Sequence, residues 1–296
     1  MVSLQVKRVL EEAVKILKDN NIDEAIIKAK IVLCMVLKIE KEYIIINDSK
    51  EMAKEDEEKY FQYINKLKNG IPLQYITNNQ EFMKLNFFVD ENVLIPRADT
   101  EILVEEVISL ANDDKNKILD VCTGSGAIAV SLAKYIKNSN VMAIDISKEA
   151  LKIAEKNAFN NNVNIKFIES DLFNYLEEND FDIIVSNPPY IRENVINELS
   201  IEVKHEPKIA LDGGKDGLDF YRKLSSESYK YLKEDGYLCL EIGYDQKNEV
   251  IEILKNEKKY KNIYSKKDLF GNDRIIIAQK VGEWNVFFIW CKRRIK

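Results

Sequence analysis

The chain has 296 residues, of which 46% are hydrophobic and 32% charged, a balance that predicts a soluble globular protein rather than a disordered one. A formal net charge of −6 disfavours a protein that grips long nucleic acid, because that task needs a basic face. Four dispersed cysteines and a single histidine disfavour a disulfide framework or a zinc ribbon, and they exclude a multi-histidine metal site. A reducing cytoplasmic location fits these cysteines, and no apolar run is long enough to cross a membrane.

Residues 1–79 predict a small helical domain, because apolar residues recur there at helical spacing and Gly70-Ile71-Pro72 ends the pattern. Ser3 can cap the first helix, and the apolar run from Tyr43 to Ile46 fits either a helix or a strand. The region holds no catalytic constellation. It either packs against the rest of the chain or, as we favour, docks the substrate, because the second domain needs a way to choose its substrate.

Residues 80–97 predict a β-hairpin linker, because apolar side chains alternate from Phe82 to Ile95. Asp90-Glu91-Asn92 is the expected turn. Arg97 and the pair Thr100-Glu101 then stand where a helix begins. This arrangement indicates either a capping box or a lid over a site, with Arg97 as a lid candidate.

Residues 98–281 alternate strands with helices, which predicts a mostly parallel α/β sheet covered on both faces. The strand at 117–121 ends in Cys122-Thr123-Gly124-Ser125-Gly126, where glycines let the backbone approach a ligand at a helix N-terminus. The strand at 141–145 ends in Asp145, about 20 residues after the glycines, where an acid can hold two ribose hydroxyls. Together these features predict an adenosine ligand.

The loops after the next two strands complete the predicted site. Asp171 could bind an adenine amino group, and Leu172 could cover a ring face. The fourth strand ends in Asn187-Pro188-Pro189-Tyr190, a loop stiffened by its prolines. The Asn187 side-chain oxygen and the Pro188 backbone oxygen can accept hydrogen bonds from a planar NH2 group, against which Tyr190 can lie. The alternative is a rigid turn in which Asn187 satisfies local backbone.

Two adenosine-containing ligands, NAD(P) and S-adenosylmethionine (SAM), fit this arrangement. Asp120 lies just before the glycine loop, where it can meet a charged amino-acid end rather than a pyrophosphate. The loop is short of the three-glycine dinucleotide pattern, and hydride transfer needs no loop that presents an NH2 group. The sequence therefore favours methyl transfer from SAM.

Residues 118–126, 143–147 and 186–190 resemble the class I SAM-dependent methyltransferases that carry an Asn-Pro-Pro-Tyr motif. Five further segments are similar to the HemK/PrmC family, namely Gly70 to Ile76, Leu94 to Glu101, Glu206-Pro207, Gly214 to Leu218 and Asp273-Arg274. The resemblance covers about residues 3 to 280. It implies a Rossmann-like seven-stranded sheet beside the small N-terminal helical domain and the hairpin linker.

The resemblance implies methyl transfer from SAM to the side-chain amide nitrogen of the glutamine in the GGQ motif of class I release factors. We expect a cytoplasmic monomer that needs no metal and binds neither membrane nor nucleic acid stably. Asn187 and Pro188 would be catalytic, and substrate contacts would run from Asn187 through Pro189 to Tyr190. Glu206 joins Arg97 as a lid candidate. The SAM contacts would be Asp120, Cys122, Thr123, Gly124, Ser125, Gly126, Asp145, Asp171, Leu172 and Asn187.

Two residues and one segment depart from the family pattern. Cys122 stands where the family usually has glycine, and Leu172 is often aromatic in relatives, so we expect weaker SAM binding from both. The segment 282–296 extends beyond the family's usual end and holds both tryptophans. It is interpreted as a loosely attached extension, with a basic-aromatic contact to ribosome or membrane as the alternative.

Other functions stay open. A sister enzyme would methylate a glutamine of a ribosomal protein. An adenine or guanine methyltransferase would flip out a base and usually carries a basic recognition region. A non-enzymatic SAM-binding protein would not need the intact Asn-Pro-Pro-Tyr loop. No general base is visible, and His205 is interpreted as a loop residue, so the proton is expected to leave to water.

Overall fold

The computed structural model describes residues 5–46, 48–112 and 116–282. Contacts divide the chain into two compact units, one of Met1–Asn79 with Ser200–His205 and one of Gln80–Leu199 with Glu206–Lys296. Among the described residues, no helix is long and apolar enough to span a membrane. The predicted Ser3 cap and the C-terminal extension from residue 283 onward lie outside the described residues.

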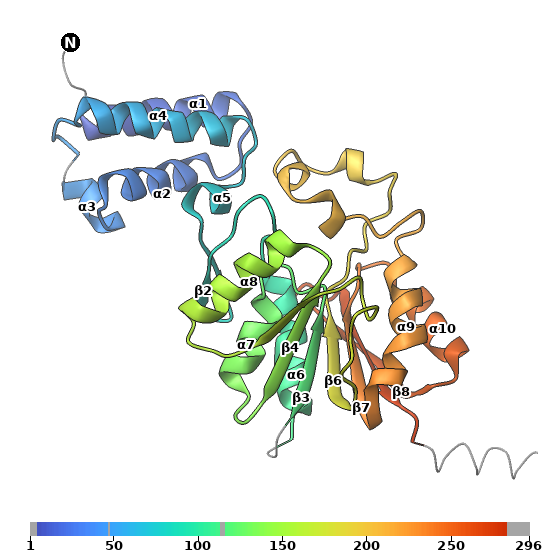
Figure 1. Cartoon of the computed structure of the whole chain (residues 1–296). Coiled ribbons are helices and arrows are strands. Elements are labelled where there is room, and N and C mark those ends of the chain that lie inside the picture. The colour runs from blue at the N-terminus through green and yellow to red at the C-terminus, as the bar shows by residue number, and fades with distance from the viewer. Residues whose placement is uncertain (1–4, 47, 113–115, 283–296) are drawn as a thin grey trace, which may run out of the picture. The chain divides into compact units, whose positions relative to one another are not determined.

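The first unit is a helical bundle whose apolar faces meet in one core (Figure 1). Tyr60 is fully buried in it, and its hydroxyl donates to the Ala29 carbonyl oxygen at 3.1 Å. The ambiguous run ending at Ile46 is helical. The helices are α1 (Val6–Asp19), α2 (Ala25–Leu37), α3 (Lys41–Ile46), α4 (Lys54–Lys68) and α5 (Leu73–Thr77).

A segment from far along the chain, Ser200–His205, belongs to this first unit. Ile201 lies over Gly70, where a Cβ would come within 2.6 Å of the Ile201 Cγ1 atom. The His205 Nε2 atom lies 3.1 Å from the Asn69 carbonyl oxygen. Gly70 therefore does more than end a helix, because it also leaves room for this distant segment.

The second unit begins with a short antiparallel hairpin, β1 (Gln80–Phe82) and β2 (Leu85–Phe87). Residues 90–92 do form a turn, in which the Val93 N–H donates to the Asp90 carbonyl oxygen at 3.2 Å, but the prediction that this turn closes the hairpin is wrong. The hairpin reverses at Met83 and Lys84, which have φ of +50° and +58°. Two consecutive left-handed residues suit a tight hairpin, but neither is the glycine or asparagine that signals one in sequence. Glu101 does not close a capping box; its Oε1 accepts from the Met83 backbone N–H at 2.7 Å.

A seven-stranded sheet with the order β5-β4-β3-β6-β7-β9-β8 forms the centre of the second unit. The first five strands in that order pair in parallel, whereas β9 is antiparallel to both neighbours. This confirms the predicted mostly parallel sheet. The strands are β3 (Lys117–Val121), β4 (Asn140–Asp145), β5 (Lys166–Glu169), β6 (Phe181–Ser186), β7 (Leu232–Glu241), β8 (Tyr260–Lys267) and β9 (Asp273–Lys280).

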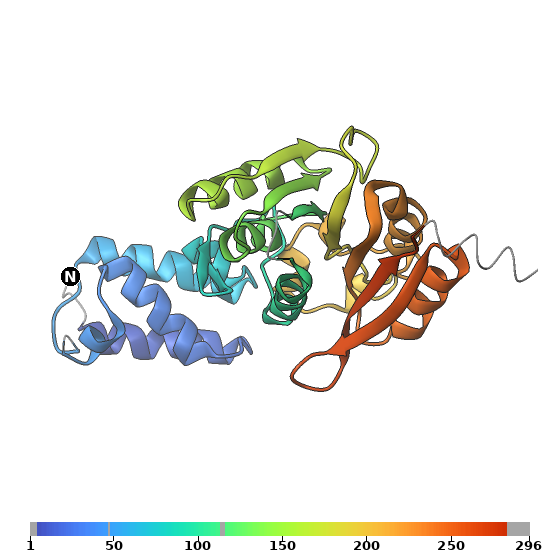
Figure 2. The same ribbon diagram turned by 90° about the horizontal axis from the view of Figure 1, so that it is seen from below.

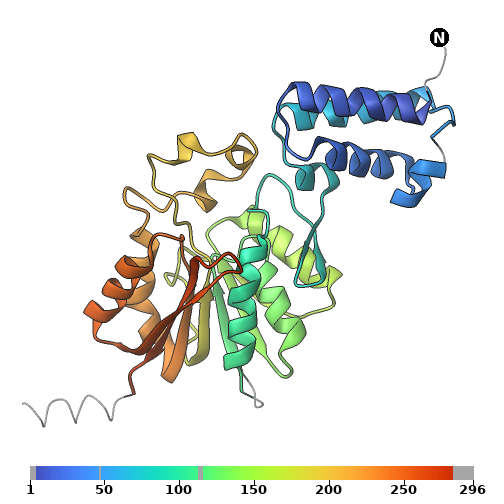
Figure 3. The same cartoon turned by 180° about the vertical axis from the view of Figure 1, so that it is seen from behind.

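The alternation of side chains along each strand places hydrophobic cores on opposite faces of the sheet. Ile118 and Ile183 join one core, and their neighbours Leu119 and Ile184 join the other. Helices α6 and α7 contribute to the first core, and α9 and α10 to the second (Figures 1, 2 and 3). The helices of this unit are α6 (Ala98–Leu110), α7 (Ala127–Tyr135), α8 (Lys148–Asn160), α9 (Asp219–Tyr231) and α10 (Lys247–Glu257).

The five parallel strands all end at one edge of the sheet, so the loops that follow them meet there. Strand β9 begins at the same edge, because Ile275 near its start pairs with Glu241 at the end of β7. Open α/β sheets bind their ligands at this carboxyl edge.

Candidate active site

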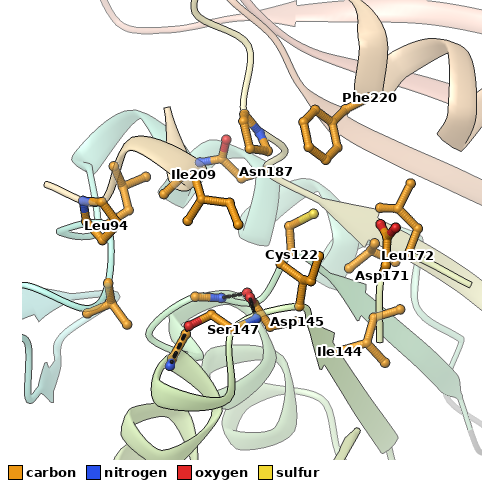
Figure 4. Close-up of a pocket in the computed structure, with 18 of the residues that line it drawn as sticks. Leu94, Cys122, Ile144, Asp145, Ser147, Asp171, Leu172, Asn187, Ile209 and Phe220 are labelled. Carbon is orange, nitrogen blue, oxygen red and sulfur yellow. Dashed lines mark hydrogen bonds between the residues drawn. The ribbon is translucent and has the colours of Figure 1, made fainter. Parts of the chain in front are cut away.

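A pocket with an empty volume of about 780 Å³, part of it open to solvent, lies at the carboxyl edge (Figure 4). Residues that follow β3, β4, β5 and β6 line it. Figure 4 shows Asn187 and Phe220 on one side of the pocket and Asp145 on the opposite side, with Cys122 between them. Its size and largely apolar walls suit a nucleoside-sized ligand with a few polar contacts.

The glycine loop after β3 is fixed by a buried carboxylate. Asp120 Oδ2 accepts from Thr123 Oγ1 at 2.6 Å and from the Ala129 backbone N–H at 3.2 Å. Gly126 has φ of +80°, and a Cβ there would lie 3.0 Å from the Ala154 Cβ atom. Asp120 thus holds the loop against the start of α7, and it lies behind the pocket wall rather than in it.

Asp145 connects the end of β4 to the glycine loop. Its Oδ2 accepts from the Gly124 backbone N–H at 2.8 Å, and its Oδ1 accepts from that of Ser147 at 2.9 Å (Figure 4). Burial raises the pKa of Asp145, while the backbone hydrogen bonds lower it. Asp171 lines the same pocket. Two carboxyl groups in one pocket suit a ligand that carries hydroxyl or amino donors.

Two pocket residues adopt left-handed backbone although neither is glycine. The φ angle is +62° at Cys122 and +50° at Leu172. The Ser170 hydroxyl donates to the Leu172 carbonyl oxygen at 2.6 Å, which fixes the turn after β5. Burial raises the pKa of the Cys122 thiol far above its usual range, so this side chain is a neutral part of the wall.

The loop after β6 presents the Asn187 amide in one orientation. Its Nδ2 donates to Thr100 Oγ1 at 3.2 Å. No described residue donates to its Oδ1, which leaves that oxygen as the acceptor for a ligand. Further along the loop, Gln246 Nε2 donates to the Tyr190 carbonyl oxygen at 3.0 Å and holds the backbone in place.

Tyr190 belongs to the scaffold of this loop. Its side chain packs against a hydrophobic core, and burial raises its pKa beyond the usual range. The next residue, Ile191, donates its N–H to the Leu211 carbonyl oxygen and accepts from the Gly213 N–H, both at 2.9 Å. Phe220, rather than Tyr190, supplies an aromatic ring to the pocket.

The two lid candidates form an ion pair, Arg97 with Glu206. Glu206 is only 5% exposed, and its Oε2 also accepts from the Ile95 backbone N–H at 3.2 Å. The next residue, Pro207, lines the pocket. The pair therefore joins the segment before α6 to the segment that closes one side of the pocket.

Comparisons with known proteins identify the family. Residues 8–77 match the PrmC N-terminal domain and residues 98–206 the Methyltransferase small domain. A release factor glutamine methyltransferase from Clostridium acetobutylicum is 43% identical over 285 residues, which cover 94% of this chain and 100% of that protein. The chain belongs to the release factor glutamine methyltransferase family. A release factor glutamine methyltransferase from Bacillus cereus is 36% identical over 283 residues, which cover 93% of this chain and 99% of that protein.

The fold agrees with this family. The solved structure of a methyltransferase from Pyrococcus furiosus is similar, with a TM-score of 0.53, 21% identity and coverage of 75% of this chain and 99% of that chain. The likeness is one of fold, and it confirms the predicted class I methyltransferase architecture. The predicted family, HemK/PrmC, and its methyltransferase activity are confirmed by the relatives' names and their near-full coverage.

The predicted site residues divide into pocket lining and support. Within the described part of the chain, the pocket is lined by seven of them, namely Cys122, Gly124, Asp145, Asp171, Leu172, Asn187 and Pro189. The others lie behind or beside it, namely Asp120, Thr123, Ser125, Gly126, Pro188, Tyr190, Arg97 and Glu206. Three further pocket residues, Phe220, Ile209 and Pro207, were not predicted as site residues, because they come from the region after β6 and no strand end marks them.

Glu241, the last residue of β7, was not predicted as a site residue either. It is 1% exposed, and its Oε2 has no partner among the described residues. Burial raises its pKa to about 7, against the opposing effects of the Thr100 side chain, the Arg274 charge and the Asn187 side chain. An acid at the end of an apolar strand was the signal that could have found it.

Glu241 should make the stability of the protein depend on pH. Its pKa rises from 4.5 to about 7 on folding, so its contribution to stability is complete below about pH 4.5 and is lost as the pH rises through 7. Glu241→Gln stays neutral at every pH. Between about pH 5 and 8 the unfolding free energy of the natural chain should therefore fall by on the order of 3 kcal/mol more than that of Glu241→Gln. Urea unfolding at both pH values measures this. Glu234→Gln, at an exposed site on the same strand, should leave the fall unchanged, and equal falls in all three proteins would contradict the assignment.

Cys122 offers a second test. Cys122→Val should weaken SAM binding at least tenfold, because a β-branched residue at φ of +62° is strained and adds a methyl group to the pocket wall. Cys122→Gly should bind SAM at least as tightly as the natural chain. Titration calorimetry gives both affinities, with Cys34→Val in α2 as the control. Unchanged affinity in Cys122→Val would mean that this position does not touch the cofactor.

Proposed function

We propose that the chain transfers a methyl group from SAM to the side-chain amide nitrogen of the glutamine in the GGQ motif of class I release factors. Membership of the release factor glutamine methyltransferase family supports this substrate. The observation that carries the proposal is the orientation of Asn187, whose Nδ2 is held by Thr100 while its Oδ1 stays available in the pocket. An amide NH2 is the donor that such an acceptor needs.

The pocket fits SAM as the methyl donor. SAM supplies an electrophilic methyl group on a sulfonium together with an adenosine. Asp145 and Asp171 would accept hydrogen bonds from the ribose hydroxyls and the adenine amino group. Leu172 and Ile144 provide apolar wall for the ring. The glycine loop, held by Asp120, would bring its backbone close to SAM.

The catalytic contribution of the chain is positional. An amide nitrogen is a poor nucleophile because its lone pair is delocalised. Hydrogen bonds from the NH2 to Asn187 Oδ1 and to the Pro188 carbonyl oxygen would aim the nitrogen at the methyl group and favour partial loss of amide resonance. In-line placement can contribute about 7–11 kcal/mol. The proton leaves to water after transfer.

We further propose that the protein acts as a cytoplasmic monomer without a metal or stable nucleic-acid binding, and that the first unit docks the substrate. The net charge of −6 supports the absence of nucleic-acid binding. Among the described residues, no group of three or more His, Cys, Asp and Glu side chains could hold a metal ion. The match of residues 8–77 to the PrmC N-terminal domain supports a role particular to this family.

Incubation with tritiated-methyl SAM tests the proposed substrate. A class I release factor, a mixture of ribosomal proteins and duplex DNA serve as parallel acceptors. We expect label in the release factor. Label in DNA alone would replace the proposal by base methylation, and label in a ribosomal protein alone would replace it by the sister activity.

A further inference from the structure

Two large apolar side chains stand fully in solvent at the tip of the β8–β9 loop. Leu269 is 98% exposed and Phe270 is 88% exposed. Among the described residues no other large hydrophobic side chain is as exposed as either. Single exposed apolar residues are common on protein surfaces, whereas two adjacent ones at a loop tip form an apolar surface that a partner can cover.

The loop that carries them is held in one conformation. Asp268 Oδ1 accepts from the backbone N–H groups of Phe270 and Asn272, each at 2.9 Å. The Asp268 N–H donates to the Asn272 carbonyl oxygen at 2.8 Å, and Gly271 takes a left-handed φ of +87°. A fixed tip loses little conformational entropy when it meets a partner.

The same loop is tied to the scaffold of the active site. The Arg274 Nη2 atom lies 3.1 Å from an oxygen of the Asp268 carboxylate and 3.1 Å from an oxygen of the Asp99 carboxylate, so one guanidinium joins the loop to the start of α6. Asp99 directly precedes Thr100, which holds the Asn187 amide. The tip and the nucleophile-positioning loop therefore share one support.

Strand order places the tip at the same edge of the sheet as the pocket. The loop leaves β8 and enters β9 at the carboxyl edge of the sheet, and Figure 2 shows it as an orange-red turn that projects from the strands. Strand β9 lies two places from β6 in the sheet, a lateral separation of about 10 Å. Between them, the loop after β7 carries Tyr244, which is 68% exposed. Tyr244, Leu269 and Phe270 are thus exposed apolar side chains on loops at the carboxyl edge, which also carries the Asn187 loop.

We propose that Leu269 and Phe270 bind the folded protein that carries the glutamine, at a surface beside the modified loop. The inference rests on the proposed function, and it names a part of this chain that selects the protein substrate. A glutamine that reaches Asn187 from a folded protein brings the neighbouring surface of that protein over the carboxyl edge. Leu269 and Phe270 stand at that edge, on a loop whose strand β9 lies two places from β6, so this surface can reach them.

The variant L269S/F270S tests the inference against two acceptors, a full-length class I release factor and a short peptide containing its GGQ glutamine. The KM for the release factor should rise at least tenfold, while kcat at saturation, SAM affinity and the rate with the peptide stay unchanged. The peptide is too short to reach the tip. The conservative variant L269M/F270L should restore the KM. Phe159→Ser serves as control, because Phe159 is 82% exposed near the end of α8, at the opposite edge.

Other outcomes would overturn the inference. An unchanged KM in L269S/F270S would show that the tip does not bind the substrate. An equal rise of the KM in Phe159→Ser would show that any exposed aromatic residue replaced by serine has this effect. Sedimentation tests a second copy of this chain as the occupant. That occupant replaces the protein substrate if the natural chain self-associates, the variant is monomeric and the KM is unchanged. Failure of the natural chain to methylate the release factor would reject the proposed function itself, and the inference with it.

Discussion

Replacing Asn187 with alanine should lower the rate of methyl transfer by at least about two orders of magnitude, the loss typical of removing one positioned hydrogen-bonding group from an active site. The variant loses the acceptor that we propose aims the substrate nitrogen, whereas Asp145 and the glycine loop remain. SAM affinity should therefore stay within about tenfold, a change of roughly 1.4 kcal/mol. A tritiated-methyl assay gives the rate and titration calorimetry gives the affinity.

The conservative replacement Asn187→Asp separates the two roles of the amide. A carboxylate keeps an acceptor for the substrate but cannot donate to Thr100 Oγ1 as Nδ2 does. Its rate should fall between those of the natural chain and Asn187→Ala. Full activity in Asn187→Ala would show that the Asn-Pro-Pro-Tyr loop is structural here, which is the alternative that the sequence left open.

Replacing Gly213 with alanine should also abolish most activity, although Gly213 lies outside the pocket wall. A Cβ there would meet the Tyr190 Cα at 2.7 Å and the Pro189 carbonyl oxygen at 2.9 Å, so the Pro-Pro-Tyr backbone would have to move. A displacement of about 1 Å can cost about a hundredfold in rate. SAM binding, which we propose to depend mainly on the ends of β3 and β4, should change far less.

Gly282→Ala is the matched control for Gly213→Ala. A Cβ at Gly282 meets nothing closer than 3.6 Å, so activity and stability should match the natural chain. Steady-state rates and SAM affinities of both variants test the expectation. A Gly213→Ala enzyme with an unchanged rate would show that the 213 segment does not position the catalytic loop.

Local patterns in the sequence predict much of the fold and part of the site. The glycine loop, Asp145 and Asn187 stand at strand ends, and a strand end is visible in sequence as an apolar run that stops. The edge at which parallel strands end then brings them together without further information. The candidate cofactor contacts therefore follow from the sequence alone.

What the sequence did not predict depends on contacts between distant residues. The Met83-Lys84 turn has no glycine or asparagine, and it is held by Glu101 from the next helix. Glu241 looks like any acid after a strand until Thr100 and Asn187 are seen beside it. Gly213 shows its value only through the backbone it touches. In each case the deciding neighbour lies many residues away.

We propose that this chain methylates the side-chain amide of a glutamine in a release factor. Tandem mass spectrometry locates the added methyl group in a class I release factor that has been incubated with SAM and either the natural chain or Asn187→Ala. We expect one added methyl group on the glutamine of the GGQ motif with the natural chain and almost none with Asn187→Ala. An unmodified glutamine, or a methyl group on another residue, would contradict it.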